Sequence, residues 1–387
     1  MTYLPEALKA SATDRDSYRP LIFRPALQQD AAALEALLER NRHITVVDHL
    51  HGQLEELVRV LNPSKRYGPE ELAEAAVAHL NGVPAWSYGA WVFYPWSARL
   101  VHLLDGPEFA LVRTDRNRNK ITREEQAVLA GKKVGVIGLS VGQSVALAMT
   151  LERGYGEIRL ADFDTLELSN LNRIRSGVQE MGIKKVINTA REIAEIDPFL
   201  KVVCYPEGIT SSNLNAFLTD EAPLDLLIEE CDSTDIKILA RLRCRDLGIP
   251  LVMDTSDRGL IDLERYDLEP HRSIAHGLLD GLDLSIAENG MTPAQKFEYI
   301  MTMVGKETLS ARMKATLPEI GRTVLTWPQL GAHVTLGGAL TAEIARKVAL
   351  GQMEWSGRWW IDLDELLTAE RSSVSSIKVV PDPNTQD

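Results

Sequence analysis

The chain has 387 residues, 45% of them hydrophobic, and a formal net charge of −13. This is the composition of an ordinary globular protein that is long enough for two domains. The acidic balance argues against general nucleic-acid binding, which needs a basic surface. No run approaches the roughly 18 apolar residues of a membrane span, and the first thirty residues lack a basic-then-apolar signal. We therefore expect no membrane association and a cytoplasmic location.

Cysteine is scarce: Cys204, Cys231 and Cys244 are the three in the chain. None forms a pair separated by two residues. Neither a four-cysteine zinc site nor a disulfide framework is available to this sequence, so we expect no zinc.

Residues 1–112 differ in character from the rest and are predicted to form an N-terminal helical and hairpin domain. Two helices are expected within residues 30–60, because apolar residues there recur three and four apart. Pro69 opens a third helix, since proline is favoured in a first helical turn. The aromatic and β-branched segments 91–96 and 99–104 flank a short turn and predict a hairpin.

A polar, basic segment at 113–131 precedes a regular alternation of strands and helices. Strands are predicted at 133–138, 157–162, 200–204, 224–229 and 250–254, and helices at 142–153, 183–196 and 234–247. Repeated strand–helix units indicate an α/β domain over residues 113–265, with a doubly wound, Rossmann-like, mostly parallel sheet.

Beyond Asp257 the alternation gives way to loops and then to helices near 293–317 and 333–350. We expect residues 266–370 to complete the α/β domain and its substrate cleft. Trp327-Pro328-Gln329 is a candidate cleft segment, although an anchor for loop packing would explain it equally well. Residues 371–387 are poor in aromatic residues and are predicted to be a disordered tail.

A glycine turn follows the first predicted strand of this domain. It reads Gly138-x-Ser140-x-Gly142, with Gln143 where a dinucleotide motif would carry its last glycine. Backbone N–H groups at the start of the next helix could face a phosphate. The turn alone is a weak signal, because any strand-to-helix connection can contain it.

Asp162 follows Gly138 by 24 residues and ends the second predicted strand. A carboxylate at that edge of the sheet can accept both ribose hydroxyls of a nucleotide, although a solvated strand end would also place an acid there. Asp164 lies two residues further along and belongs to the same polar run.

Three groups suited to phosphates come next: Asn170, Arg173 and Lys185. Arginine binds phosphate through two N–H groups and lysine as a mobile point charge. Singly, each cation is better interpreted as a solvated surface group, but their joint placement indicates a triphosphate clamp. Asp232 ends the fourth strand and is a candidate Mg²⁺ ligand, and it could also cap the helix that begins near Thr234.

The run Asp162-Phe163-Asp164-Thr165 through Ser169-Asn170-Leu171-x-Arg173 resembles the ThiF/MoeB family of adenylating enzymes, which belongs to the ubiquitin-activating superfamily. The resemblance covers residues 111–265. It implies that Asp162 binds ribose, that Asn170, Arg173 and Lys185 bind the phosphates of ATP, and that Asp232 holds Mg²⁺.

In this family an arginine enters the ATP site of the partner subunit, so the resemblance also implies a homodimer. Arg113-x-x-Arg116-Asn117 resembles the motif that carries it, and Arg118 is a close competitor.

The resemblance implies ATP-dependent adenylation of a carboxylate on a peptide or small protein. No cysteine follows Cys244, where thioester-forming relatives carry one, so direct capture of the acyl-adenylate is expected. Members that modify ribosomally made peptides, similar to the pantocin and microcin C enzymes, carry an extra N-terminal region that clamps the peptide. Residues 1–112 suit that role in the maturation of a peptide antibiotic.

Other functions stay open at this point. The enzyme could activate the C-terminus of a ubiquitin-like sulfur-carrier protein. A NAD-dependent oxidoreductase would use Gly138 and Asp162 but would leave Arg173, Lys185 and Asp232 unexplained. An inactive binding scaffold would account for the departures from the glycine pattern.

Overall fold

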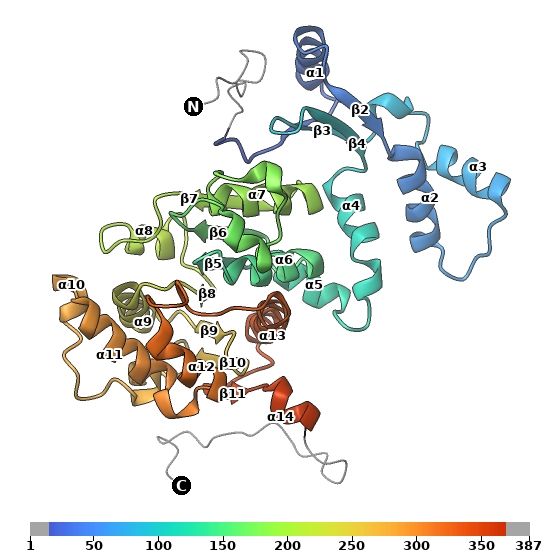
Figure 1. Cartoon of the computed structure of the whole chain (residues 1–387). Helices are drawn as coiled ribbons and strands as arrows, with labels where there is room; N and C mark the ends of the chain where they lie inside the picture. The colour runs from blue at the N-terminus through green and yellow to red at the C-terminus, as the bar shows by residue number, and fades with distance from the viewer. Residues whose placement is uncertain (1–14, 369–387) are drawn as a thin grey trace, which may run out of the picture. The chain divides into compact units, whose positions relative to one another are not determined.

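The computed structural model describes residues 15–368, which fall into two compact units (Figure 1). Within the described residues, the N-terminal unit covers 15–123 and 194–199, and the C-terminal unit covers 124–193 and 200–368. The predicted tail at 371–387 lies outside the described residues. Within residues 15–368, no helix combines the length and the apolar character that crossing a bilayer requires.

The N-terminal unit contains a four-stranded sheet in the order β1-β3-β4-β2. The predicted hairpin is present as antiparallel strands β3 (Ala90–Tyr94) and β4 (Arg99–Leu103). Two short strands that the sequence did not predict flank it, β1 (Leu21–Phe23) and β2 (Thr45–Asp48), the latter parallel to β4.

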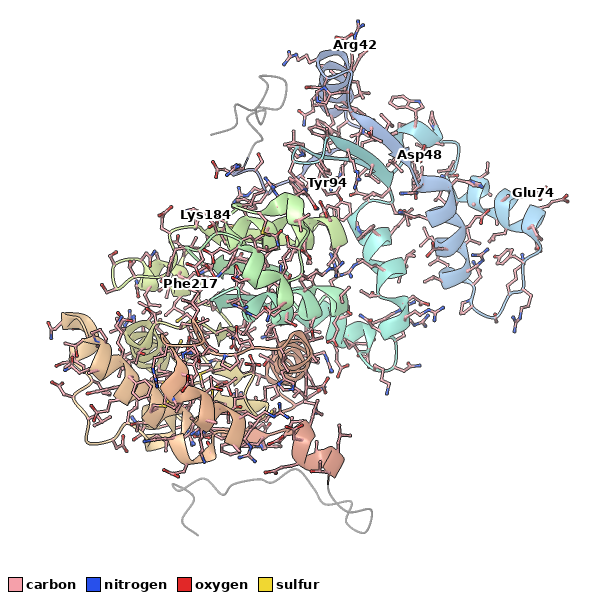
Figure 2. All side chains as sticks on the ribbon, viewed as in Figure 1. Arg42, Asp48, Glu74, Tyr94, Lys184 and Phe217 are labelled. Carbon is pink, nitrogen blue, oxygen red and sulfur yellow. The ribbon has the colours of Figure 1, made fainter. Side chains whose placement is uncertain are left out.

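This unit also contains helices, of which the first three were predicted from the sequence and the fourth was not. They are α1 (Gln28–Arg40), α2 (Leu50–Leu61), α3 (Pro69–His79) and α4 (Gly106–Arg113), with short 3₁₀ turns at Ala85–Ser87 and Asp115–Asn117. Leu50, Leu54 and Leu57 of α2 are buried against Ala76 and Leu104. Asp48, labelled in Figure 2, starts α2 by accepting a hydrogen bond from the Leu50 N–H at 3.0 Å.

The C-terminal unit is built on a seven-stranded sheet in the order β11-β10-β9-β8-β5-β6-β7. Its five predicted strands are present and parallel: β5 (Lys133–Ile137), β6 (Glu157–Ala161), β7 (Lys201–Tyr205), β8 (Leu226–Glu229) and β9 (Leu251–Thr255). The predicted α/β, doubly wound, mostly parallel fold is therefore confirmed. Two antiparallel strands, β10 (Leu260–Glu264) and β11 (Gly357–Trp360), extend it where loops were expected.

The helices of this unit lie on both faces of its sheet. Figure 1 shows α6 and α13 together on one face and α9 on the other. Their bounds are α5 (Arg123–Leu129), α6 (Gly142–Glu152), α7 (Lys185–Ile196), α8 (Leu214–Thr219), α9 (Thr234–Leu247), α10 (Ile286–Asn289), α11 (Pro293–Val304), α12 (Ala311–Thr316), α13 (Gly331–Ala349) and α14 (Leu363–Thr368). Short 3₁₀ turns occur at Leu168–Asn172, Val178–Glu180, Ile274–Gly277, Lys306–Thr308 and Leu317–Glu319.

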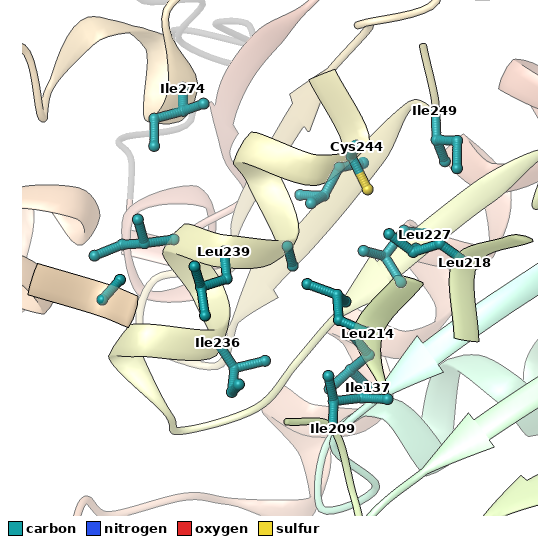
Figure 3. Close-up of a cluster of buried hydrophobic side chains, with 14 of the residues drawn as sticks. Ile137, Ile209, Leu214, Leu218, Leu227, Ile236, Leu239, Cys244, Ile249 and Ile274 are labelled. Carbon is teal, nitrogen blue, oxygen red and sulfur yellow. The ribbon is translucent and has the colours of Figure 1, made fainter. Parts of the chain in front are cut away.

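The main apolar core of this unit lies between α9 and the sheet (Figure 3). Ile236, Leu239 and Cys244 of α9 pack with Ile137 and Leu227, which come from neighbouring strands. This packing fixes the carboxyl ends of β5 and β8 side by side, because both strands bury their apolar side chains under the same helix.

The polar segment 113–131 contains helical structure that the sequence analysis did not predict. It contains the Asp115–Asn117 turn and helix α5, and Leu129 is fully buried. Leu129 anchors helix α5 in the interior. Because charged and polar residues surround it in the sequence, the hydrophobic pattern alone did not predict this helix.

Candidate functional site

The glycine turn lies between β5 and α6, and Gly138 cannot be replaced there without strain. Its φ is +87°, and an added Cβ would come within 2.6 Å of the Glu230 carbonyl oxygen. Only glycine adopts this conformation while a neighbouring strand passes so closely. The turn therefore brings the start of α6 next to the end of β8.

Asp162 directly follows β6, all of whose residues are buried, as predicted. One carboxylate oxygen accepts a hydrogen bond from the Leu139 N–H at 2.7 Å, and the other accepts from the Asp164 N–H at 2.8 Å. Burial raises the pKa of this carboxyl, while the charge of Lys185 and these two N–H donors oppose the rise. The carboxylate is thus held rigidly beside the glycine turn, where a ribose would lie.

Lys185 begins α7 and is buried, with 7% of its surface exposed. Its Nζ donates to Asp164 Oδ2 at 2.7 Å, and its backbone N–H donates to the Asp164 carbonyl at 2.9 Å. The lysine and both aspartates therefore form one charged cluster at the carboxyl edge of the sheet.

Arg173 follows the 3₁₀ turn Leu168–Asn172 and contacts the glycine turn from the side. Its Nε donates to Ser140 Oγ at 2.9 Å, and its Nη1 donates to Asn172 Oδ1 at 2.8 Å. Burial lowers the pKa of the guanidinium, and the nearby Asp232 carboxylate counteracts that shift. The structure thus brings Ser140, Arg173 and Asp232 together, although their positions in the sequence are far apart.

Asn170 has a structural role in the turn that carries Arg173, and its role as a phosphate ligand stays a prediction. It is buried, and its Oδ1 accepts a hydrogen bond from the Glu167 N–H at 3.0 Å. The Glu167 side chain accepts in return from the Asn170 N–H, so the two residues form a capping box around the 3₁₀ turn. In this arrangement Asn170 shapes the turn that carries Arg173.

Gln143, which replaces the last glycine of a dinucleotide motif, has a clear structural role. Its side chain is 2% exposed. Nε2 donates to the Arg175 carbonyl at 2.9 Å, and Oε1 accepts from the Arg175 N–H at 2.8 Å. The amide thereby fastens the segment after Arg173 to the first turn of α6, a role that no local pattern in the sequence indicates.

These elements surround a cavity of about 280 Å³, which we call the nucleotide cavity. Its wall includes the following predicted residues: Gly138, Ser140, Asp162, Asp164, Lys185 and Asp232. Of the described residues, two predicted phosphate ligands, Arg173 and Asn170, do not line the cavity. Arg173 is hydrogen-bonded to the hydroxyl of Ser140, which does line it. Glu230 and Lys296 also line the cavity and were not predicted.

Asp232 is the predicted magnesium ligand, and the surroundings fit a metal that arrives with a nucleotide. Its exposed side chain borders the nucleotide cavity. The N-cap of α9 is Ser233, so capping does not occupy Asp232. Within residues 15–368 no group of three or more His, Cys, Asp or Glu side chains could hold a metal ion. Mg²⁺ usually takes one or two carboxylates plus substrate phosphates, which a single aspartate beside this cavity allows.

Arg116 and Arg118, the candidates for a cross-subunit arginine, belong to the N-terminal unit. Arg116 lies exposed in the Asp115–Asn117 turn. Arg118 is also exposed, and its Nη1 donates to Asp115 Oδ1 at 3.0 Å. An exposed position suits a group that would act on a partner subunit, and that role stays a prediction for both.

The cysteines differ in their surroundings. Cys244 lies in the apolar core, whereas Cys204 and Cys231 are partly exposed. Cys231 lines the nucleotide cavity, where burial and the Glu229 carboxylate raise its thiol pKa well above the usual range. The thiolate is the nucleophilic form, so this environment disfavours covalent chemistry at Cys231.

Comparison with known proteins agrees with this site. The ThiF family model matches residues 114–257. A protein from Mycobacterium tuberculosis, MT1398, is 43% identical over 277 residues, which are 72% of this chain and 38% of that protein. The adenylyltransferase and sulfurtransferase UBA4 of Lodderomyces elongisporus is 32% identical over 146 residues, 37% of this chain and 31% of that protein. The chain thus spans less than two fifths of the length of either relative.

Two solved structures are similar at low sequence identity. E. coli MccB with ATP has a TM-score of 0.48 and 13% identity, covering 86% of both chains. E. coli TcdA, a tRNA N6-threonylcarbamoyladenosine dehydratase, in complex with ATP has a TM-score of 0.45 and 17% identity, covering 62% of this chain and 94% of that one. The family match rests on the sequence, and it coincides with the strands and turns that build the nucleotide cavity. Residues 114–257 therefore form a ThiF family domain.

Proposed function

We propose that this protein adenylates a carboxylate at the expense of ATP. One observation carries the proposal: the glycine turn, the Asp162 carboxylate, Lys185 and Asp232 surround a single cavity, and Arg173 is bonded to its wall. A nucleotide whose ribose binds Asp162 would direct its phosphates along the glycine turn toward these cations. The relative UBA4 carries the name adenylyltransferase, which supports the same class of reaction.

The reaction needs little beyond positioning and charge. A carboxylate oxygen of the substrate attacks the α-phosphorus of ATP, the bond to the bridging oxygen breaks, and pyrophosphate leaves. Negative charge grows on the leaving pyrophosphate, so Arg173 and Lys185 would stabilise the transition state electrostatically. Mg²⁺ held by Asp232 would supply a further positive charge to the phosphates when bound.

Ground-state contacts of the two cations support this assignment. Lys185 is paired with Asp164 and Arg173 is bonded to neutral oxygens of Ser140 and Asn172. A triphosphate offers a higher charge than either partner, so both side chains could exchange these contacts for phosphate oxygens.

We further propose that the acyl-adenylate passes directly to a nucleophile, without an enzyme thioester. Cys231 is the cysteine nearest the proposed chemistry, and its raised thiol pKa keeps it protonated. Cys244 is buried in the core, and burial also raises its thiol pKa.

The substrate that we favour is a peptide or small protein, held by the N-terminal unit during maturation of a ribosomally made peptide. The observation behind this choice is the edge strand β2, whose Thr45, Val46 and Asp48 side chains are exposed. An exposed edge can pair with an extended peptide through backbone hydrogen bonds. A ubiquitin-like sulfur-carrier protein offers a flexible C-terminus of the same kind and is the second candidate substrate.

Calorimetric titration tests the proposal at its first step. We expect ATP with Mg²⁺ to bind and Asp162→Ala to weaken that binding, since the ribose contact is lost. Binding of NAD in preference to ATP would indicate an oxidoreductase instead, and no binding of either would indicate a scaffold. Pyrophosphate release with peptides and small proteins encoded beside the gene then identifies the substrate.

A further inference from the structure

A second cavity adjoins the nucleotide cavity within the C-terminal unit. Its volume is about 190 Å³. The two cavities share Glu230, Cys231 and Asp232, so they meet at the segment between β8 and α9. We call this second space the side-chain cavity. At ~30 Å³ per water molecule it has room for about six waters, which suits one amino-acid side chain and excludes a folded domain.

Most of the wall of the side-chain cavity is apolar. It comes from the end of β9, from α11, from α12 and from the loop before α13. The apolar members are Val141, Met253, Ile300, Met301, Val304, Leu309, Met313, Trp327 and Pro328. Methionine and isoleucine side chains offer dispersion contacts and no strong hydrogen-bonding groups, so they favour an apolar occupant.

The loop that carries Trp327 is fastened to the phosphate side of the site. Asn172 Nδ2 donates to the Gln329 carbonyl at 2.8 Å. At the start of α13, an added Cβ on Gly331 would come within 2.7 Å of the Asn172 carbonyl oxygen, which shows how closely the loop approaches. Because Asn172 precedes Arg173, the wall of the side-chain cavity and the phosphate-binding turn are held as one unit.

The charged groups around the cavity are unevenly distributed. Four carboxyl groups contribute to its wall, those of Glu230, Asp232, Asp254 and Asp257. Lys237 also contributes, but its Nζ donates to both carboxylate oxygens of Glu229 at 3.0 and 3.1 Å. Its charge is thus balanced outside the cavity, and an acidic side chain entering the cavity would meet carboxyl groups and no unbalanced cation among the described residues of this wall.

We propose that the residue whose carboxylate is activated carries an apolar side chain, about the size of leucine or methionine, and that the side-chain cavity holds it. This inference rests on the proposed adenylation. The carboxylate would stand at the junction near Asp232, facing the α-phosphate in the nucleotide cavity. Its side chain would extend between α11 and Trp327. A glycine would leave the cavity empty, and a glutamate would bring a charge beside four carboxyl groups.

The test uses the full-length protein and four N-acetylated dipeptides, Ala-Gly, Ala-Leu, Ala-Met and Ala-Glu. Exchange of labelled pyrophosphate into ATP measures reversible adenylate formation, because the reverse attack of pyrophosphate on the acyl-adenylate restores ATP. We expect kcat/KM for Ala-Leu and Ala-Met to exceed that for Ala-Gly by roughly 10- to 100-fold. Ala-Glu should be at least as poor as Ala-Gly.

Two variants locate the effect. Val304→Trp fills the side-chain cavity and should reduce the preference of Ala-Leu over Ala-Gly to within about threefold, with ATP binding unchanged. Glu298→Trp places the same bulk on an exposed position of α11 and should retain the preference. Exchange that is equal for all four dipeptides, or best with Ala-Gly, would contradict the proposed role of the side-chain cavity but not the proposed adenylation. Intact ATP binding without exchange for any dipeptide would overturn recognition of the activated residue by the side-chain cavity; adenylation itself is then tested by pyrophosphate release with longer peptides and small proteins, which also offer contacts to the N-terminal unit.

Discussion

Asp254 at the end of β9 allows a stability measurement whose sign and size follow from the structure. Its side chain is 4% exposed, and burial raises its pKa to about 6 from an ordinary value of 3.8. The neighbouring Glu230 carboxyl, which accepts a hydrogen bond from the Asp254 N–H at 2.9 Å, has its pKa raised in the same direction. Two carboxyl groups in one buried site cannot both ionise without cost.

A carboxyl whose pKa is higher in the folded protein contributes stability below the unfolded pKa and loses it as the pH rises through the folded pKa. For Asp254 that window runs from about pH 4 to pH 6. A shift of about two units corresponds to ~3 kcal/mol of unfolding free energy between the two limits, of which about half is lost between pH 5 and pH 8.

Asp254→Asn removes this titration and gives Glu230 an amide donor in place of a second acid. Relative to the wild type, the free energy of unfolding of the variant should therefore rise by about 1–2 kcal/mol between pH 5 and pH 8. Urea denaturation at both pH values measures it. Asp246→Asn, at a side chain that is 58% exposed, serves as the control and should show a constant difference. A difference for Asp254→Asn that is equal at both pH values, or smaller at pH 8, would show that Asp254 does not have a raised pKa in the folded protein.

Three further outcomes concern the proposed chemistry. Arg173→Ala should lower turnover by roughly 100-fold or more and weaken ATP binding less, because the lost charge acts mainly in the transition state; unchanged pyrophosphate release from the folded variant would remove Arg173 from the mechanism. A variant with all three cysteines changed to serine should still form product, and a thiol-sensitive covalent enzyme–substrate species in the native protein would contradict direct capture. In a homodimer, mixing Arg116→Ala/Arg118→Ala protein with Arg173→Ala protein should restore activity, since one hybrid site is intact. If a confirmed mixed dimer does not regain activity, neither Arg116 nor Arg118 acts across the subunit interface.

The parallel strands and the carboxyl-edge residues could be predicted because their signals are local. Runs of apolar residues alternate with amphipathic helices, and Asp162 and Lys185 stand at strand and helix ends that the pattern locates within a residue or two. The family motif then assigns their order along one edge of a parallel sheet.

Strand β10 was not predicted, because its buried acidic residues are of a type that is usually found in loops. Asp262 and Glu264 are fully buried. Arg358 Nε lies 3.0 Å from Asp262 Oδ2, and Arg241 Nε lies 2.7 Å from Glu264 Oε2. Both partners are distant in the chain, and only tertiary structure shows that these charges are balanced.

The side-chain cavity, like strand β10, could not be predicted from the sequence. Trp327 stood out in the sequence, yet loop packing explained it as well as substrate contact. In the structure, Trp327, Met313 and Val304 line one cavity that shares part of its wall with the nucleotide cavity, and substrate contact at Trp327 stays a proposal. Such a meeting of three separate segments has no signature in local periodicity.

The identity of the nucleotide product tests the central claim most directly. During turnover with a carboxylate substrate, adenylation predicts AMP and pyrophosphate in equal amounts, because the substrate attacks the α-phosphorus. Chromatographic separation of the products of α-labelled and γ-labelled ATP measures this ratio, because the α-label stays in AMP and the γ-label leaves in pyrophosphate. Formation of ADP and inorganic phosphate instead would show attack at the γ-phosphorus and contradict adenylation.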